Sequence, residues 1–219
     1  RPQRPGPSWV RVTALGSYRE VGRAMHLVTT NESKVLVDCG AKPTSNRNEV
    51  QPFFAAPEML PLDNIDAVVI THAHVDHIGM LPVLFRFGYK GPVYCTQPTR
   101  DLMTLLQMDY IKVAQAEGNE APYSKSDIQE CIKHVVDVNW GEKTDIAPDI
   151  KMTMENAGHI LGSSSVYMQI GEGRDEHKLL FSGDIKYEKS WLFDAATVRF
   201  NKVDTLVVES TYGGPQSIQ

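Results

Sequence analysis

Three of the chain's seven histidines fall within six residues, in the stretch AVVITHAHVDHIGM at positions 67–80. They are His72, His74 and His77, and Asp76 lies between the last two. The stretch opens with a short apolar run typical of a buried strand, so the imidazoles stand where that strand ends. A surface loop has no structural need for this pattern, whereas imidazole and carboxylate groups are ligands that zinc prefers. The string therefore predicts a metal centre at a strand end.

The close spacing of these donors favours two ions over one. In an extended strand end, residues two apart face the same side, so His72, His74 and Asp76 can line one side. A turn at Asp76 can then bring His77 round to a neighbouring point. Four ligands this close are hard to arrange around one tetrahedral ion and easier to share between two ions about 3.5–4 Å apart.

Two further residues are candidates to complete the centre. His159 in NAGHILG and Asp184 in LLFSGDIK both follow predicted strands and have glycine beside them. Glycine lets the backbone approach a site closely. A carboxylate such as Asp184 can bridge two ions, so we expect both residues at the metal centre.

The remaining histidines lack such a context, and a lone histidine is more often a partly exposed polar residue than a ligand. His134 lies on a predicted helix face and His177 in a polar turn, so we interpret both as structural or solvated. His26 lies on a predicted strand near an arginine-rich loop, and its role stays open.

Short strands and helices alternate without a regular βαβ rhythm. Strands are predicted at 9–16, 34–40, 65–71, 91–96, 150–159, 164–171, 178–184 and 203–210. Residues 41–57 read as a long loop. Helices are predicted at 98–118, from Pro98 to Gly118, and at 124–135, where Ser124 and Asp127 resemble a cap. This mixture favours an α/β fold with two layers of mixed sheet covered by helices.

Charge and cysteine content narrow the functional classes. The net charge is −5, so the whole surface does not indicate nucleic-acid binding, but residues 1–25 carry five arginines against one acid, Glu20. Cys39, Cys95 and Cys131 are odd in number and far apart, which argues against a disulfide framework and fits a reducing cytoplasm. No apolar run approaches the ~18–20 residues of a membrane span, so we expect no membrane association.

Six motifs in order resemble one family. They are GSYREVGRAMHLV, VLVDCG, THAHVDHIGMLP, NAGHILGSS, FSGDIK and VVESTYGG. Together they resemble the metallo-β-lactamase superfamily and, within it, the β-CASP branch of nucleases, especially its archaeal members. The resemblance implies an αββα sandwich, of which residues 9–212 form the first part of the hydrolase domain. It also implies that 1–8 is a linker from an upstream KH-type domain and that 213–219 begins the connection to a β-CASP cap beyond this chain.

The resemblance also implies residue roles. One zinc is held by His72, His74 and His159, the second by Asp76 and His77, and Asp184 bridges them. Asp38 orients a ligating imidazole, Asp76 also orients the nucleophile, and Glu209 steers a proton-donating histidine of the cap. Arg19 and Arg23 are candidates to hold flanking RNA phosphates, although exposed structural arginines would look the same. The sequence departs from the family at Met25 and His26, where small residues are expected.

The implied activity is zinc-dependent hydrolysis of RNA phosphodiester bonds by an endonuclease, with 5′–3′ exonuclease action as an open second mode. Transcription termination and RNA 3′-end processing are the implied settings. Single-stranded RNA, RNA polymerase or other termination machinery, and a second copy in a homodimer are the implied partners. Two alternatives remain, a small-ester or thioester hydrolase on the same fold and a non-catalytic RNA-binding member. Because a further ligand and the cap would lie beyond this chain, residues 1–219 alone are expected to be inactive.

Overall fold

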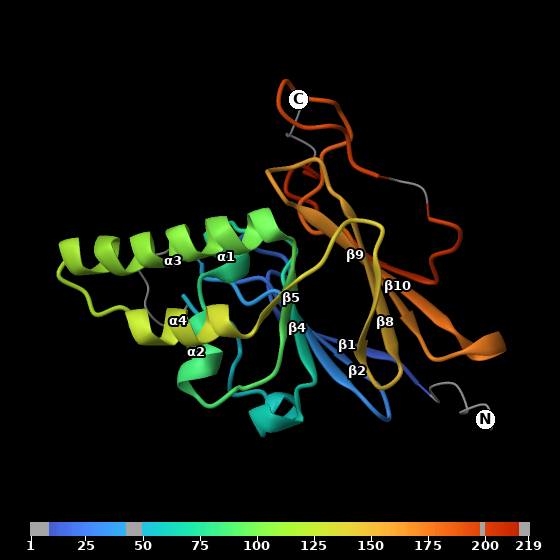
Figure 1. The fold of residues 1–219 in the computed structure, drawn as a ribbon, viewed down its shortest axis with the longest axis horizontal. Coiled ribbons are helices and arrows are strands. Elements are labelled where there is room, and N and C mark those ends of the chain that lie inside the picture. The colour runs from blue at the N-terminus through green and yellow to red at the C-terminus, as the bar shows by residue number, and fades with distance from the viewer. Residues whose placement is uncertain (1–8, 43–49, 198–199, 215–219) are drawn as a thin grey trace.

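Two β-sheets pack face to face, and helices cover the outer face of the first sheet (Figure 1). The computed structural model describes residues 9–42, 50–197 and 200–214. The predicted linker at 1–8 and residues 215–219 of the predicted connection lie outside the described residues. The predicted two layers of mixed sheet with helical cover are confirmed.

The first sheet has the strand order β1-β2-β3-β4-β5-β6. Its strands are β1 (Arg11–Gly16), β2 (Met25–Thr29), β3 (Lys34–Val37), β4 (Ala67–Val69), β5 (Val93–Cys95) and β6 (Val135–Asp137). Pairing is antiparallel from β1 to β3 and parallel from β3 to β6. All three residues of β4 are buried, which explains a continuous apolar run rather than an alternating one.

The second sheet has the order β11-β10-β9-β8-β7. Its strands are β7 (Lys143–Ala147), β8 (Ile150–Asn156), β9 (Ser164–Ile170), β10 (His177–Phe181) and β11 (Thr205–Val207). Only β10 and β11 pair in parallel among these strands. In β8 the buried Ile150, Met152 and Met154 alternate with half-buried polar residues, as expected for a strand with one face on the core.

In the part of the chain that the structure describes, four α-helices lie between or beside the strands of the first sheet. They are α1 (Val75–Ile78), α2 (Leu81–Arg86), α3 (Gln97–Ala116) and α4 (Lys125–Lys133), and short 3₁₀ turns lie at Pro57–Met59, Leu62–Asn64 and Gly173–Asp175. Pro98 lies in the first turn of α3, and Gly118 follows its end with a φ of 71°. Ser124 and Asp127 form a reciprocal capping box at the start of α4, so the predicted cap is confirmed. None of the described helices is both long enough and apolar enough to cross a bilayer.

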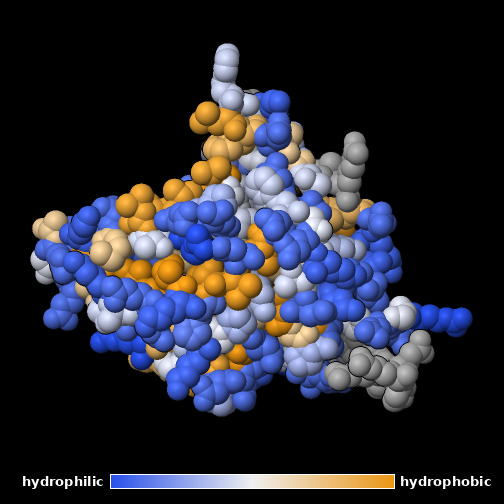
Figure 2. Space-filling model, viewed as in Figure 1, coloured by the Kyte–Doolittle hydropathy of each residue, from blue (hydrophilic) through white to orange (hydrophobic). Residues whose placement is uncertain are grey.

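Two apolar cores hold the layers together. One lies between the helices and the first sheet and includes Leu84 and Met103. The other lies between the sheets, where Val35 and Val69 face Met168 and the second sheet. Figure 2 shows that apolar side chains also reach the surface along the helical layer, and Leu105 and Val113 of α3 belong to that exposed set.

Sequence reasoning missed α1, α2, β6 and β7, and it placed one histidine wrongly. His177 is not in a turn but opens β10, where its Nε2 lies 3.0 Å from the Thr205 hydroxyl. His134 is the residue that ends α4, and its Nδ1 lies 2.9 Å from the Glu130 carbonyl oxygen. Both histidines therefore have structural partners.

Candidate metal centre

The histidine loop is pinned to the end of the parallel strands by main-chain hydrogen bonds. The Cys39 N–H donates to the His77 carbonyl over 2.8 Å, and the Ala24 N–H donates to the Asp76 carbonyl over 2.8 Å. Gly40 lies so close that a Cβ there would stand 1.5 Å from the Asp76 carbonyl oxygen. The backbone that follows β3 thus fixes the positions of Asp76 and His77 at the strand ends. Only glycine fits at position 40.

Two loops of the second sheet bring the other donors to the same end of the sandwich. His159 follows β8, and its N–H donates to the Ser163 hydroxyl over 3.1 Å. Asp184 follows β10, and the preceding Gly183 has a φ of 57° and packs against the Thr71 side chain. The loops therefore meet across the interface between the sheets.

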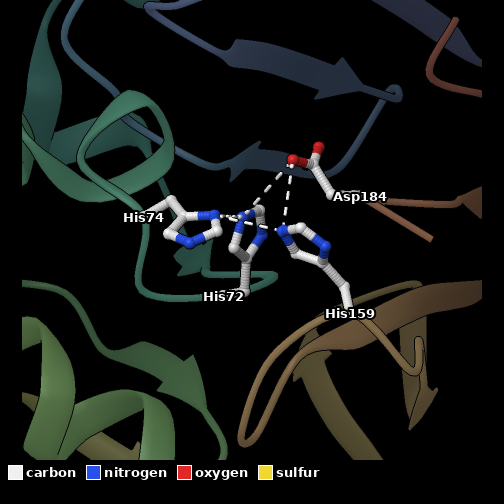
Figure 3. Close-up of side chains that lie close together, drawn as sticks. All are labelled: His72, His74, His159 and Asp184. Carbon is white, nitrogen blue, oxygen red and sulfur yellow. Dashed lines mark hydrogen bonds and ion pairs between the residues drawn. The ribbon is translucent and has the colours of Figure 1, made fainter. Parts of the chain in front are cut away.

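Four side chains converge on one point. The ligand atoms of His72, His74, His159 and Asp184 all lie within 4.8 Å of one another (Figure 3). His74 Nδ1 lies 3.1 Å from His72 Nε2 and 3.1 Å from His159 Nε2. Asp184 Oδ2 lies 3.7 Å from His72 Nε2 and 3.6 Å from His159 Nε2. Three ring nitrogens and one carboxylate oxygen thus outline a small cage.

The size and chemistry of this cage fit zinc. Ligands about 2.0–2.2 Å from a tetrahedral ion stand about 3.3–3.6 Å from one another. Four of the six donor separations run from 3.1 to 3.7 Å, close to that edge length, and all six are within 4.8 Å. Imidazole nitrogen with one carboxylate is also a donor set that zinc takes in proteins.

His77 and Asp76 lie on the other side of Asp184. His77 Nε2 is 3.3 Å from Asp184 Oδ1 and 3.8 Å from Asp76 Oδ2. Asp184 therefore turns Oδ2 to the four-residue cage and Oδ1 to His77, which is the arrangement a bridging carboxylate requires. The expectation that Asp76 follows the side of His72 and His74 is not met, because the strand ends and α1 begins at Val75.

Asp38 is buried beneath His77. Its Oδ2 lies 2.8 Å from His77 Nδ1, so the other ring nitrogen, Nε2, faces Asp184. A carboxylate in this position fixes the orientation of a ligating imidazole. Asp38 itself has a φ of 61°, a conformation that few residues other than glycine, asparagine and aspartate adopt readily.

Thr71 is a residue that sequence reasoning missed. Its N–H donates to Asp38 Oδ1 over 2.8 Å and its hydroxyl lies 2.9 Å from Asp38 Oδ2. The same hydroxyl lies 3.0 Å from His72 Nδ1. Thr71 therefore connects Asp38, which orients His77, with His72, which belongs to the four-residue cage. A threonine directly before the histidine string was the available signal, but threonine is too common at strand ends to stand out.

Burial and neighbouring carboxylates shift the pKa values of the histidines in opposite directions. Burial lowers the pKa of His72 well below its ordinary value and lowers the pKa of His159. Burial alone would also lower the pKa of His77, but Asp38 and Asp184 raise it to about 10. Neutral imidazoles offer the lone pairs that metals need. The pair of carboxylates around His77 meanwhile favours positive charge at that point.

The two candidate arginines have different surroundings. Arg23 Nε lies 2.6 Å from Glu20 Oε1, and its guanidinium stacks over Phe53 at 6.0 Å, so Arg23 is engaged in the fold. Arg19 is exposed and lines the cavity in front of the metal-site residues. Its guanidinium has no hydrogen bond or ion pair to the described residues. Arg19 is therefore the arginine available to a ligand.

Glu209 lies beside the metal centre but does not join the four-residue cage. Its Oε1 accepts a hydrogen bond from the Ile185 N–H over 2.9 Å, and its own N–H donates to the Ser182 hydroxyl over 3.1 Å. These contacts brace the loop that carries Asp184 from both sides. Contact with a histidine of a cap lies beyond the described residues.

Comparison with known proteins gives the same family for most of the chain. Residues 33–219 match the family described as "Beta-lactamase superfamily domain". The chain is 52% identical over 211 residues to "Transcription termination factor FttA" of Methanosarcina mazei, covering 96% of this chain and 33% of that protein. It is 50% identical over 217 residues to the protein of the same name from Thermococcus kodakarensis, with 96% and 33% covered. The chain thus spans about a third of the length of these relatives.

Solved structures with a similar fold are remote in sequence. A metallo-β-lactamase from Cronobacter sakazakii, a HARLDQ motif mutant, has a TM-score of 0.52 and 17% identity, covering 78% of this chain and 60% of that one. A protein of unknown function from Enterococcus faecalis V583 has a TM-score of 0.56 and 15% identity, covering 81% and 44%. These likenesses establish the fold alone.

Proposed function

Because this chain belongs to the metallo-β-lactamase superfamily, we propose that it forms the metal-binding part of a zinc-dependent RNA phosphodiesterase acting in transcription termination or RNA 3′-end processing. The relatives named for transcription termination support that setting, since they share about half of their residues with this chain across a third of their length. Cleavage is endonucleolytic in this proposal, and 5′–3′ exonuclease action is a second mode of the same site.

One observation carries the hydrolytic part of the proposal. Asp184 turns one carboxylate oxygen to the cage of His72, His74 and His159 and the other to His77. Such a carboxylate can serve two ions at once. Two zinc ions, when bound, supply Lewis acidity, lowering the pKa of water toward ~7 and offsetting negative charge on a reacting phosphate.

The chain's own residues hold and orient the reacting groups in this proposal. Asp38 keeps His77 Nε2 directed at the site. Asp76, whose side chain is 27% exposed, orients the attacking water from the cavity side. Arg19 pairs with a phosphate of the bound strand, because its guanidinium is exposed at the cavity. Single-stranded RNA, the termination machinery including RNA polymerase, and a second copy of the protein are the proposed partners.

The full-length protein is expected to cleave labelled single-stranded RNA only while it holds zinc. Chelation followed by dialysis should abolish cleavage, and added zinc should restore it. Gel analysis of 5′-labelled and 3′-labelled RNA distinguishes internal cuts from stepwise trimming. Hydrolysis of a thioester without RNA cleavage would favour the small-ester alternative. RNA binding with zinc present but no cleavage would favour a non-catalytic member.

Glu209→Gln in the full-length protein is expected to slow RNA cleavage while the zinc content stays near that of the wild type. Glutamine keeps an oxygen that can accept the Ile185 N–H, so the Asp184 loop should remain braced, whereas the negative charge is lost. Zinc per chain measured by elemental analysis, together with the cleavage rate, checks this expectation. Loss of zinc from Glu209→Gln would instead show that the charge itself supports the metal centre.

A further inference from the structure

The cavity in front of the metal centre has an aromatic side chain at its mouth. The cavity measures about 450 Å³ and is lined by Tyr18, Arg19 and Val21 as well as by Asp76, His77 and Asp184. That volume falls within the range of about 300–1,000 Å³ typical of sites for small organic groups. Tyr18 is 44% exposed, so its ring is open to a ligand.

His26 holds this tyrosine in place. His26 Nδ1 lies 3.1 Å from the Tyr18 hydroxyl, and the two rings meet edge to face with centroids 5.3 Å apart. On its other side the His26 ring packs at 5.3 Å against Phe181, which is buried in the core between the sheets. A chain of contacts therefore runs from the core through His26 to Tyr18. His26 is one of the two residues, with Met25, at which this sequence departs from the pattern of the family it resembles.

The loop that carries Tyr18 is held in an unusual conformation. Ser17, Arg19 and Arg23 have φ values of 68°, 62° and 47°, although none of them is glycine. Residues held in this region cluster at ligand-binding sites, where the surroundings enforce them. Glu20 helps to hold the loop in this conformation, because its carboxylate pairs with Arg23 at 2.6 Å and with Lys42 at 2.8 Å. The loop is thus braced with Tyr18 and Arg19 side by side at the cavity.

An exposed aromatic ring beside an available guanidinium matches the two parts of a nucleotide. Bases of single strands stack on aromatic side chains, and phosphates pair with arginine. We propose that Tyr18 is the stacking platform for the nucleobase next to the scissile phosphate and that Arg19 contacts the adjoining backbone phosphate. This subsite rests on the proposed RNA hydrolysis, and His26 acts in it as a positioning residue for Tyr18.

The test uses the full-length protein and a short single-stranded RNA with one mapped cleavage position. Versions of this RNA carry an abasic ribose at either position that flanks the cut. The kcat/KM of wild type is expected to fall about tenfold for one of the two abasic RNAs, as the loss of one stacked base predicts. Tyr18→Ala should lower kcat/KM for intact RNA to a similar extent and should cleave intact and abasic RNA equally well.

Three further variants separate stacking from structure. Tyr18→Phe keeps the ring, so its kcat/KM should still fall when the base is missing. His26→Ala should reduce that sensitivity without changing the zinc content. Phe87→Ala is the matched control, because Phe87 is also an exposed aromatic residue, at 67%, but lies outside this cavity. It should behave as the wild type does.

The outcomes separate failure of the subsite from failure of the proposed function. RNA cleavage by wild type with no effect of either abasic position would overturn the subsite alone. The same conclusion would follow if the kcat/KM of Tyr18→Ala were still about tenfold lower for abasic RNA than for intact RNA, because the base would then be recognised elsewhere. Absence of RNA cleavage by the zinc-loaded wild type would overturn the proposed function and the subsite with it.

Discussion

Asp184→Asn in the full-length protein is expected to abolish RNA cleavage while leaving the fold intact. Asparagine keeps the shape of the side chain but removes its charge and one of its two ligand oxygens. Asp184 faces His72 and His159 with one oxygen and His77 with the other, so one side of the centre should lose its donor and the other should keep only a neutral amide oxygen. Residues that only support a ligand are worth about 10–100-fold in activity or metal affinity, and a direct shared ligand should exceed that range.

Zinc content, cleavage rate and thermal unfolding of the same preparations test this expectation. The side chain of Asp184 is 26% exposed, so the substitution should not disturb the core. His72→Ala should also abolish cleavage, although its buried position makes some loss of stability expected. His134→Ala is the matched control, because this histidine lies at the end of α4 away from the centre. Wild-type cleavage by a well-folded Asp184→Asn protein would contradict the assigned role of Asp184.

Asp38→Ala is expected to destabilise the protein strongly and to weaken metal binding. The change removes the acceptor of the Thr71 N–H and hydroxyl and the partner of His77 Nδ1, all of which are buried. Removing one partner of a buried, charged pair costs about 3–5 kcal/mol. For a domain of this size, each kcal/mol lowers Tm by about 2–4 °C, so a drop of about 10 °C is expected.

Two comparison variants separate the causes of this loss. Asp38→Asn keeps an acceptor oxygen and tolerates the positive φ, so it should be less destabilised than Asp38→Ala while still binding zinc more weakly. Asp66→Ala removes another aspartate that accepts a main-chain N–H, that of Lys34, at the opposite end of β3. It should leave the zinc content unchanged. Equal zinc affinity of Asp38→Ala and wild type would show that Asp38 does not orient His77 for metal binding.

Most secondary structure could be predicted where local signals agree with the tertiary setting. Helix α3 has helical periodicity over many residues and glycine at its end, and α4 has its cap in the sequence. The missed α1 and α2 are short, and α1 spans only Val75–Ile78 within the histidine string. Helix α1 lies where the loop docks on the backbone near Gly40, whereas α2 buries all its residues from Leu81 to Phe85, and neither contact is visible in a local pattern.

For the metal centre too, the sequence predicts one part and the tertiary structure decides the rest. The sequence by itself predicts a metal centre and determines which strand-end residues are its candidates, because histidine and aspartate at this spacing have few other uses. Only the tertiary structure decided which donors meet. Alternation along an extended strand puts Asp76 with His74, but α1 turns the chain there and sets Asp76 beside His77.

Only the tertiary structure could also decide the surroundings of the centre. His159 lies 85 residues from His74 in the chain, and its ring comes within 3.1 Å of that residue because the two sheets pack face to face. Arg19 and Arg23 look equivalent in the sequence, yet one is free at the cavity and the other is bound to Glu20. Spacing along the chain fixes only which residues are neighbours within a strand or turn. Contacts between distant segments depend on how the buried faces pack, and those contacts set the direction in which each side chain points.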